Sequence, residues 1–167
     1  SCGYFGYYQR EVAAALNVPT FMSSLMQAPL ILASLKPDQK LGIICAVAKS
    51  LTPAILAASE IHDQTRLAIA GAQDLPEFKN VIGCKGKFDN AKLEQELVGL
   101  ARNLVSEDPE IGAILLECSD MPPYALSIQQ AIKRPVFDFT TLVNWVYRGV
   151  VRQAFRVIYK NFRNLFV

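Results

Sequence analysis

Short apolar runs alternate along this chain with longer segments in which apolar residues recur every three or four positions. The uninterrupted runs are typical of strands buried in a parallel sheet, and the spaced pattern is typical of helices with one buried face. The runs predict strands at 18–22, 41–48, 66–72, 111–117 and 135–139, and the spaced segments predict helices at 4–16, 24–35, 89–106, 122–132 and from 140 onward, with a further helix starting at Thr52. Strands that alternate with helices indicate an α/β fold whose parallel sheet is covered on both faces.

The predicted strands are divided unevenly between two parts of the chain. Residues 41–139 contain four of them, enough for one complete doubly wound lobe, whereas residues 1–36 contain one strand with its flanking helices. We therefore expect 1–36 to be the remnant of a first lobe, 41–139 to be a complete second lobe, and 140–167 to be a helix that packs back across the lobes. On this interpretation, further strands of the first lobe precede Ser1 in the natural protein.

An internal repeat relates the two parts, because a shift of 116 positions aligns residues 1–21 with residues 117–137. The aligned pairs share a thiol, a tyrosine, a proline and a phenylalanine, namely Cys2 with Cys118, Tyr8 with Tyr124, Pro19 with Pro135, and Phe21 with Phe137. We expect the two tyrosines to pack helices rather than to take part in chemistry. Each copy places a cysteine directly before a predicted helix, and the second cysteine also follows the predicted strand 111–117.

A cysteine between a parallel strand and a helix lies where open α/β sheets bind their ligands. The free N–H groups of a helix N-terminus can hold a carboxylate and favour a thiolate, so we expect Cys2 and Cys118 to be partly exposed and to have lowered pKa values. Two such corners, related by a pseudo-two-fold axis, would place one thiol on each side of a shared cleft. One thiolate can then remove a proton from a carbon while the opposite thiol delivers one, which requires no metal and no cofactor.

The remaining cysteines and the single histidine carry less chemical information. The four cysteines, at positions 2, 45, 84 and 118, form no CxxC motif, and His62 is the only histidine, which disfavours a zinc site. Single cysteines in apolar surroundings are mostly buried, so we expect Cys45 and Cys84 to react slowly. His62 lies among polar residues and is expected at the surface. The α/β pattern and the lack of a signal peptide favour reduced thiols and a cytoplasmic location.

The composition is that of an ordinary globular domain. Of the 167 residues, 51% are hydrophobic and 19% are charged, and a net charge of +2 is too small to favour nucleic acid as a partner. Residues 12–35 carry no formal charge, but they include Pro19 and Pro29, so we reject a transmembrane span. The helix expected from residue 140 carries basic residues at helical spacing, which favours a packed helix with a solvated basic side, with an anionic membrane or a partner surface as the alternative. These residues are Arg148, Arg152, Arg156, Lys160 and Arg163.

The segments "SCGYFGYYQREVAAALNVPTFMSSLMQAPLIL", "AILLECSDMPPYALSIQQAIKRPVFDFTTLVNWV" and "LGIICAVAKSLTP" resemble the aspartate/glutamate racemase family, within the wider Asp/Glu/hydantoin racemase superfamily. The resemblance implies two pseudo-symmetric flavodoxin-like lobes with the active site between them. It also implies that Cys2 and Cys118 are the catalytic acid/base pair, and that the backbone around Gly3 and Ser119 holds the substrate carboxylate. Cys45 stands where family members commonly have a threonine, and we count it as a further substrate-binding residue.

The resemblance implies a cofactor-independent racemase or epimerase of an acidic amino acid or a related small carboxylate. Asp120 stands where glutamate racemases usually have a histidine, which disfavours glutamate racemase itself. Two alternatives remain open, namely a related isomerase or decarboxylase on the same scaffold, and a catalytically inactive fragment that serves as an interaction module. Glu117 and Asp120 flank Cys118 and could orient a substrate amine, although Asp120 could equally cap a helix. We expect a small-molecule carboxylate as the ligand and leave a homodimer open.

Overall fold

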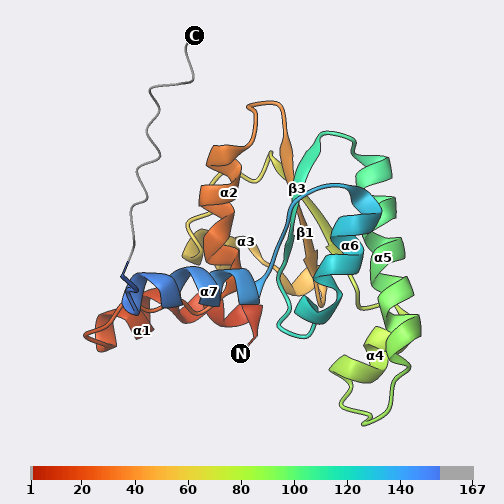
Figure 1. The fold of residues 1–167 in the computed structure, drawn as a ribbon, viewed down its shortest axis with the longest axis horizontal. Helices are drawn as coiled ribbons and strands as arrows, with labels where there is room; N and C mark the ends of the chain where they lie inside the picture. The colour runs from red at the N-terminus through yellow and green to blue at the C-terminus, as the bar shows by residue number, and fades with distance from the viewer. Residues whose placement is uncertain (1, 155–167) are drawn as a thin grey trace.

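The computed structural model describes residues 2–154 as an α/β fold around one parallel sheet (Figure 1). The sheet has four strands in the order β2-β1-β3-β4, and each neighbouring pair is parallel. The strands are β1 (Lys40–Cys45), β2 (Leu67–Gly71), β3 (Ile111–Leu116) and β4 (Val136–Phe137). This arrangement confirms the predicted four-stranded parallel lobe within residues 41–139.

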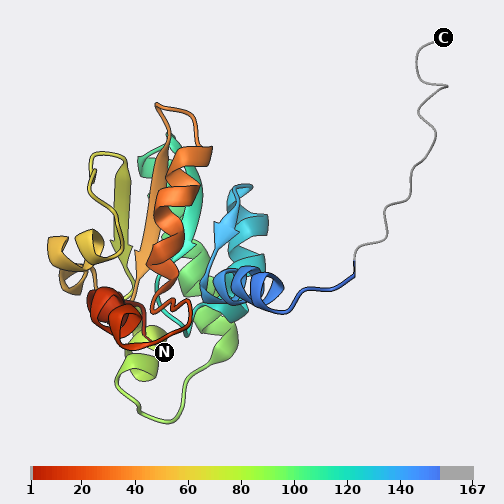
Figure 2. The ribbon, with the colours of Figure 1, turned by 90° about the vertical axis from the view of Figure 1, so that its left-hand side faces the viewer.

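Helices cover both faces of the sheet (Figures 1 and 2). The helices are α1 (Gln9–Ala15), α2 (Ala28–Ser34), α3 (Pro53–Ala58), α4 (Pro76–Ile82), α5 (Asn90–Glu107), α6 (Ala125–Ile132) and α7 (Phe139–Val150), with 3₁₀ segments at Gly3–Tyr8, Ser24–Gln27, Ala48–Ser50 and Pro122–Tyr124. Successive strand residues alternate between the faces. Ile43 and Leu115 are buried in the core formed with α2 and α3, whereas Ile44 and Leu116 are buried in the core formed with α5 and α6.

Several helices start at polar residues whose side chains cap the free backbone N–H groups of the first turn. The side chain of Thr52 accepts a hydrogen bond from the backbone three residues on, and Pro53 is the first residue of α3. Asp89 caps α5 by accepting two backbone N–H groups. Asp138 caps α7 through a capping box, in which its carboxylate accepts the N–H of Thr141 at 2.8 Å and the Thr141 hydroxyl accepts the N–H of Asp138 at 3.0 Å.

The prediction of a strand at 18–22 is wrong. This segment runs without regular structure, because no strand among residues 2–154 lies beside it to supply hydrogen bonds. Its counterpart in the repeat, β4, does pair with β3. Phe21 instead packs edge to face against Trp145 of α7, with ring centroids 5.7 Å apart. The division of the chain at 1–36, 41–139 and 140–167 stays a prediction.

Helices α4 and α7 differ from the sequence interpretation. No helix is expected at 76–82, yet α4 begins at Pro76, in the first turn where proline is tolerated, and buries Phe78. Helix α7 ends at Val150, so Arg152 lies beyond it. The other basic residues of the expected long helix, at positions 156, 160 and 163, lie outside the described residues.

The two tyrosines of the repeat and the single histidine differ in exposure. Tyr124 is buried and its hydroxyl donates to Asn90 Oδ1 at 2.8 Å, so it packs between helices as expected. Tyr8 is 53% exposed and contacts the ring of Tyr7, so the expectation that it packs helices is wrong. His62 is exposed, as expected.

Candidate active site

Cys118 lies at the carboxyl edge of the sheet, as predicted. It follows Glu117 directly after the end of β3, and the 3₁₀ segment that leads into α6 begins four residues later at Pro122. Its thiol is only 7% exposed and donates to Asp120 Oδ2 at 3.7 Å. Asp120 is therefore a partner of the thiol. The residue that precedes the 3₁₀ segment is Met121, so Asp120 does not cap it.

The N-terminal corner reaches the same edge of the sheet. Figures 1 and 2 show the N-terminal segment, in red, at the lower side of the molecule. The hydroxyl of Tyr4 donates to the carbonyl of Val47 and accepts the N–H of the same residue, both at 2.8 Å. Gly3 packs so closely against Glu117 that an added Cβ would lie 1.9 Å from the carboxylate Oε1. The first copy of the repeat is therefore held against the end of β3, where the second copy begins.

This packing places Cys2 near enough to Cys118 for its charge to act on the Cys118 thiol. Burial raises the pKa of the Cys118 thiol to about 12; a backbone hydrogen bond from Asp120 opposes the rise, and the charges of Glu117, Asp120 and Cys2 add to it. A charge on Cys2 thus acts on Cys118, although the two residues lie far apart in the sequence. Cys2 itself is half-buried. The acid/base roles of the two thiols stay predictions.

The expectation of a lowered pKa at Cys118 is wrong. That expectation places the thiol at an open helix N-terminus, but the thiol is buried at the end of a strand, and two carboxyl groups lie beside it. Burial and negative neighbours both disfavour the thiolate. In the free site, Cys118 is therefore held as a thiol at neutral pH.

The three predicted substrate-binding residues, Gly3, Ser119 and Cys45, differ in how far they are buried. Gly3 is buried, and Ser119 is half-buried directly after Cys118. Cys45 is fully buried in the core against α2 and α3, where its thiol donates to the carbonyl of Ala70 at 3.5 Å. This placement argues against substrate binding through the Cys45 thiol, because the side chain is turned into the core. Cys84, which is expected to be buried, is exposed in the turn after α4.

Glu117 is a buried acid of the site, and its burial is not predicted from the sequence. Its side chain is 1% exposed; Oε2 accepts the N–H of Ala46 at 3.3 Å, and Oε1 has no hydrogen-bond partner. Burial raises the pKa of this carboxyl to about 7, against the hydrogen bond from Ala46, which lowers it. A glutamate directly before the cysteine is visible in the sequence, but its burial depends on how the N-terminal corner folds over it.

The acids of the site form no ion pair with another described residue. None of the ion pairs found among residues 2–154 involves Glu117 or Asp120. The phenol of Tyr4 is also kept protonated, because burial raises its pKa and the charge of Glu117 adds to that rise. The side chains that this chain brings to the site are thus thiols, carboxyls and a phenol, which favour a ligand that carries positive charge.

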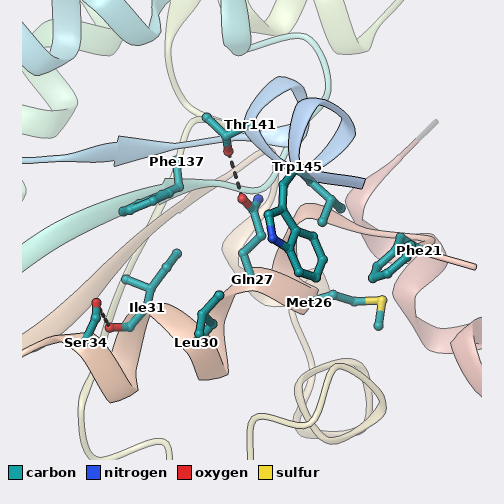
Figure 3. Close-up of a pocket in the computed structure, with 10 residues that line it drawn as sticks. Phe21, Met26, Gln27, Leu30, Ile31, Ser34, Phe137, Thr141 and Trp145 are labelled. Carbon is teal, nitrogen blue, oxygen red and sulfur yellow. Dashed lines mark hydrogen bonds between the residues drawn. The ribbon is translucent and has the colours of Figure 1, made fainter. Parts of the chain in front are cut away.

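An apolar groove of about 420 Å³ lies between α2 and α7, apart from the cysteines (Figure 3). Trp145 and Met26 lie at one end of it beside Phe21, and the amide of Gln27 accepts a hydrogen bond from the Thr141 hydroxyl at 2.8 Å. None of the predicted site residues lines this groove. It therefore belongs to the contact between the N-terminal segment and α7.

Two kinds of feature are not found within residues 2–154. No three His, Cys, Asp or Glu side chains lie close enough together in this range to hold a metal ion. No helix in the described part of the chain is long and apolar enough to cross a membrane.

The chain is similar to proteins named as dimethylsulfoniopropionate lyases. Dimethylsulfoniopropionate lyase 5 of Emiliania huxleyi (strain CCMP1516) is 32% identical over 174 residues, which cover 99% of this chain and 34% of the relative. Dimethylsulfoniopropionate lyase 3 of the same strain is 33% identical over 155 residues, 86% of this chain and 39% of the relative. The dimethylsulfoniopropionate lyase of Durusdinium sp. clade D is 31% identical over 154 residues, 90% of this chain and 51% of the relative. The chain thus spans about a third to a half of the length of these curated relatives, and no protein-family model matches it.

Among solved structures, the fold is similar to that of allantoin racemase from Pseudomonas fluorescens. The TM-score is 0.57, and the superposition covers 86% of this chain and 63% of the racemase chain. At 16% sequence identity, this similarity concerns the fold alone. It agrees with the predicted α/β class and with a flavodoxin-like lobe of the kind found in a racemase.

The exposure of the four thiols predicts an order of reactivity that differs from the one expected from the sequence. Cys84 should react first with a bulky disulfide reagent, and Cys2 should follow. Cys118, which is 7% exposed, should react slowly, and Cys45, which is fully buried, should react only after unfolding. Time-resolved labelling with peptide mass spectrometry measures this order. Labelling in denaturant, where all four thiols react alike, is the control, and rapid native labelling of Cys45 would contradict the packing described above.

Proposed function

We propose that this chain carries the two-cysteine site of an enzyme of the Asp/Glu/hydantoin racemase superfamily, and that its reaction is the elimination of dimethyl sulfide from dimethylsulfoniopropionate. The observation that carries the proposal is the packing of Gly3 against Glu117, which holds the Cys2 corner beside the end of β3, where Cys118 lies. The names of the relatives and the fold of the structural neighbour support it.

The chemistry begins at the carbon next to the carboxylate. Dimethylsulfoniopropionate carries a carboxylate at one end and a dimethylsulfonium group two carbons away. When a base removes a proton from the carbon beside the carboxylate, the electron pair of that C–H bond forms a double bond to the next carbon, and the carbon–sulfur bond breaks. The products are neutral dimethyl sulfide, acrylate, and the proton on the base. We assign the base to the thiolate of Cys118, which is fixed at the end of β3 and which forms when the thiol gives up its proton along its hydrogen bond to the Asp120 carboxylate.

The charge of the site supports a zwitterionic substrate. A plain dianion would meet the exposed Asp120 carboxylate without an ion-pair partner from the described residues, whereas a sulfonium or ammonium group is attracted to it. The carboxylate end requires donors, and the backbone N–H groups around Gly3 and Ser119 remain the predicted ones. Asp120 can thus orient the substrate with its cationic end toward this carboxylate.

Racemisation of an amino acid is the second candidate. It is favoured by the presence of two thiols in one site, since inversion needs one group to remove the proton and another to return it from the opposite face. Elimination needs only the first of these groups. The two reactions therefore share proton removal and differ in the fate of the carbanion.

The test is an exchange of segments. The segment of dimethylsulfoniopropionate lyase 5 that matches this chain is replaced by the chain itself, and the chimera is assayed beside the isolated 167-residue chain. We expect the chimera to release dimethyl sulfide and acrylate in equal amounts, and a Cys118→Ser chimera to release neither. A folded chimera that instead exchanges the α-proton of aspartate with deuterated water would favour the racemase, and a folded chimera inactive in both assays would favour the interaction module.

A further inference from the structure

Among residues 2–154, Glu117 carries the one buried carboxylate oxygen without a hydrogen-bond partner. Its Oε2 accepts the N–H of Ala46, but its Oε1 lies beneath Gly3 and accepts nothing. A buried ionised carboxylate that lacks both a cation and a full set of donors is costly. The setting of this side chain therefore favours the protonated carboxyl over the carboxylate.

Within residues 2–154, the charge of Glu117 acts on three other acids. They are Tyr4 from the N-terminal corner, Cys45 from the end of β1, and Cys118 from the segment after β3. In Tyr4, Cys45 and Cys118 burial is the larger cause of a raised pKa, and the charge of Glu117 raises each of them as well. An anion on Glu117 thus opposes an anion on each of these neighbours.

We propose that Glu117 is a positioning residue that acts through Cys118, because it seats Gly3 over the site and shares a single negative charge with the Cys118 thiol. When Glu117 is protonated, the thiolate of Cys118 forms beside a neutral group. When Glu117 is ionised, the same thiolate forms beside a buried anion and is disfavoured. The inference rests on the proposed function only in taking Cys118 as the reacting thiol.

Shared charge makes the two titrations interdependent, so Cys118 does not follow the curve of an isolated thiol. Well below its pKa, the thiolate fraction of an isolated thiol rises tenfold with each pH unit. Near pH 7, where Glu117 loses its proton, the new anion cancels part of this rise. The logarithm of the Cys118 alkylation rate should therefore climb below pH 6, flatten near pH 7 and climb again above pH 8.

The experiment measures alkylation of the native 167-residue chain by iodoacetamide from pH 5.5 to pH 9.5, with the Cys118 peptide quantified by mass spectrometry. In Glu117→Gln the flattening near pH 7 should disappear. The ratio of the variant rate to the wild-type rate should be near one below pH 6 and about tenfold above pH 8, as expected for the removal of one neighbouring charge. Glu107→Gln, an exposed glutamate at the end of α5, is the matched control and should follow the wild type.

Two results would overturn the proposal. A ratio that is raised equally at every pH would mean that the substitution only loosens the site, because a loosened structure exposes the thiol without changing its titration. A wild-type profile that climbs evenly through pH 7 would exclude the shared charge even if Glu117→Gln failed to fold. Neither result depends on substrate, so an inactive chimera with a flattened wild-type profile would reject the lyase and retain the charge coupling.

Discussion

Exchanging Cys118 for serine should lower the release of dimethyl sulfide by the chimera about 10²- to 10⁴-fold, the range that a general acid or base contributes. Serine preserves the size of the side chain and its ability to donate to Asp120, but its hydroxyl is far too weak an acid to provide a base near neutral pH. Although the residue is buried after the end of β3, the similar size and the retained hydrogen bond should leave the fold unchanged. Stability measured by urea unfolding checks this point.

The pH dependence of the same assay tests the assignment of the base. Because the pKa of Cys118 is raised to about 12, the thiolate fraction should keep rising above pH 8, and the rate with it, without the plateau expected of an ordinary cysteine. Cys84→Ser is the control, since this thiol is exposed in a turn and lies outside the site. Full activity in Cys118→Ser, together with loss in Cys2→Ser, would move the base to the other copy of the repeat.

The order of strands and helices in residues 41–139 can be predicted because each strand is a short, almost uninterrupted apolar run. Segment 111–116, for example, is buried at every position, as expected of a strand with helices on both faces. The wrong prediction of a strand at 18–22 arises because an apolar run does not show whether a partner strand is present. That segment has the composition of a strand, but a strand forms only where a partner completes its hydrogen bonds, and the pattern of one segment does not contain that information.

The place of Cys118 in the fold can also be predicted, whereas the electrostatics of the candidate site cannot. The repeat identifies Cys2 and Cys118, and the alternation of strand and helix places Cys118 at the carboxyl edge. The direction of the pKa shift depends on burial, and burial at this edge depends on where the N-terminal corner packs. Glu117 could be noticed beside Cys118, but its unpartnered oxygen arises from the placement of Gly3, which is distant in the sequence.

The close packing of Gly3 against Glu117 predicts that substitution of this glycine lowers both stability and activity. An alanine Cβ there would lie 1.9 Å from Oε1, 2.5 Å from Cδ and 2.6 Å from Cγ of Glu117, and that side chain is too deeply buried to move aside freely. Gly3→Ala should therefore destabilise the fold by about 1–3 kcal/mol, as overpacking does. It should also displace the Cys2 corner and lower the activity of the chimera by about 10²-fold, since a shift near 1 Å can cost that much.

A second substitution separates this steric effect from other consequences of losing a glycine. In the Gly3→Ala background, Glu117→Ala removes all three crowded atoms, so it should restore much of the lost stability and give a double-mutant cycle far from additive. Gly99→Ala in α5 is the matched control, because nothing lies within 4 Å of its added Cβ and alanine favours the helix. Urea unfolding of the four chains measures the cycle. Additive losses from Gly3→Ala and Glu117→Ala would show that the two residues do not touch, and the corner would then have to reach the end of β3 by another contact.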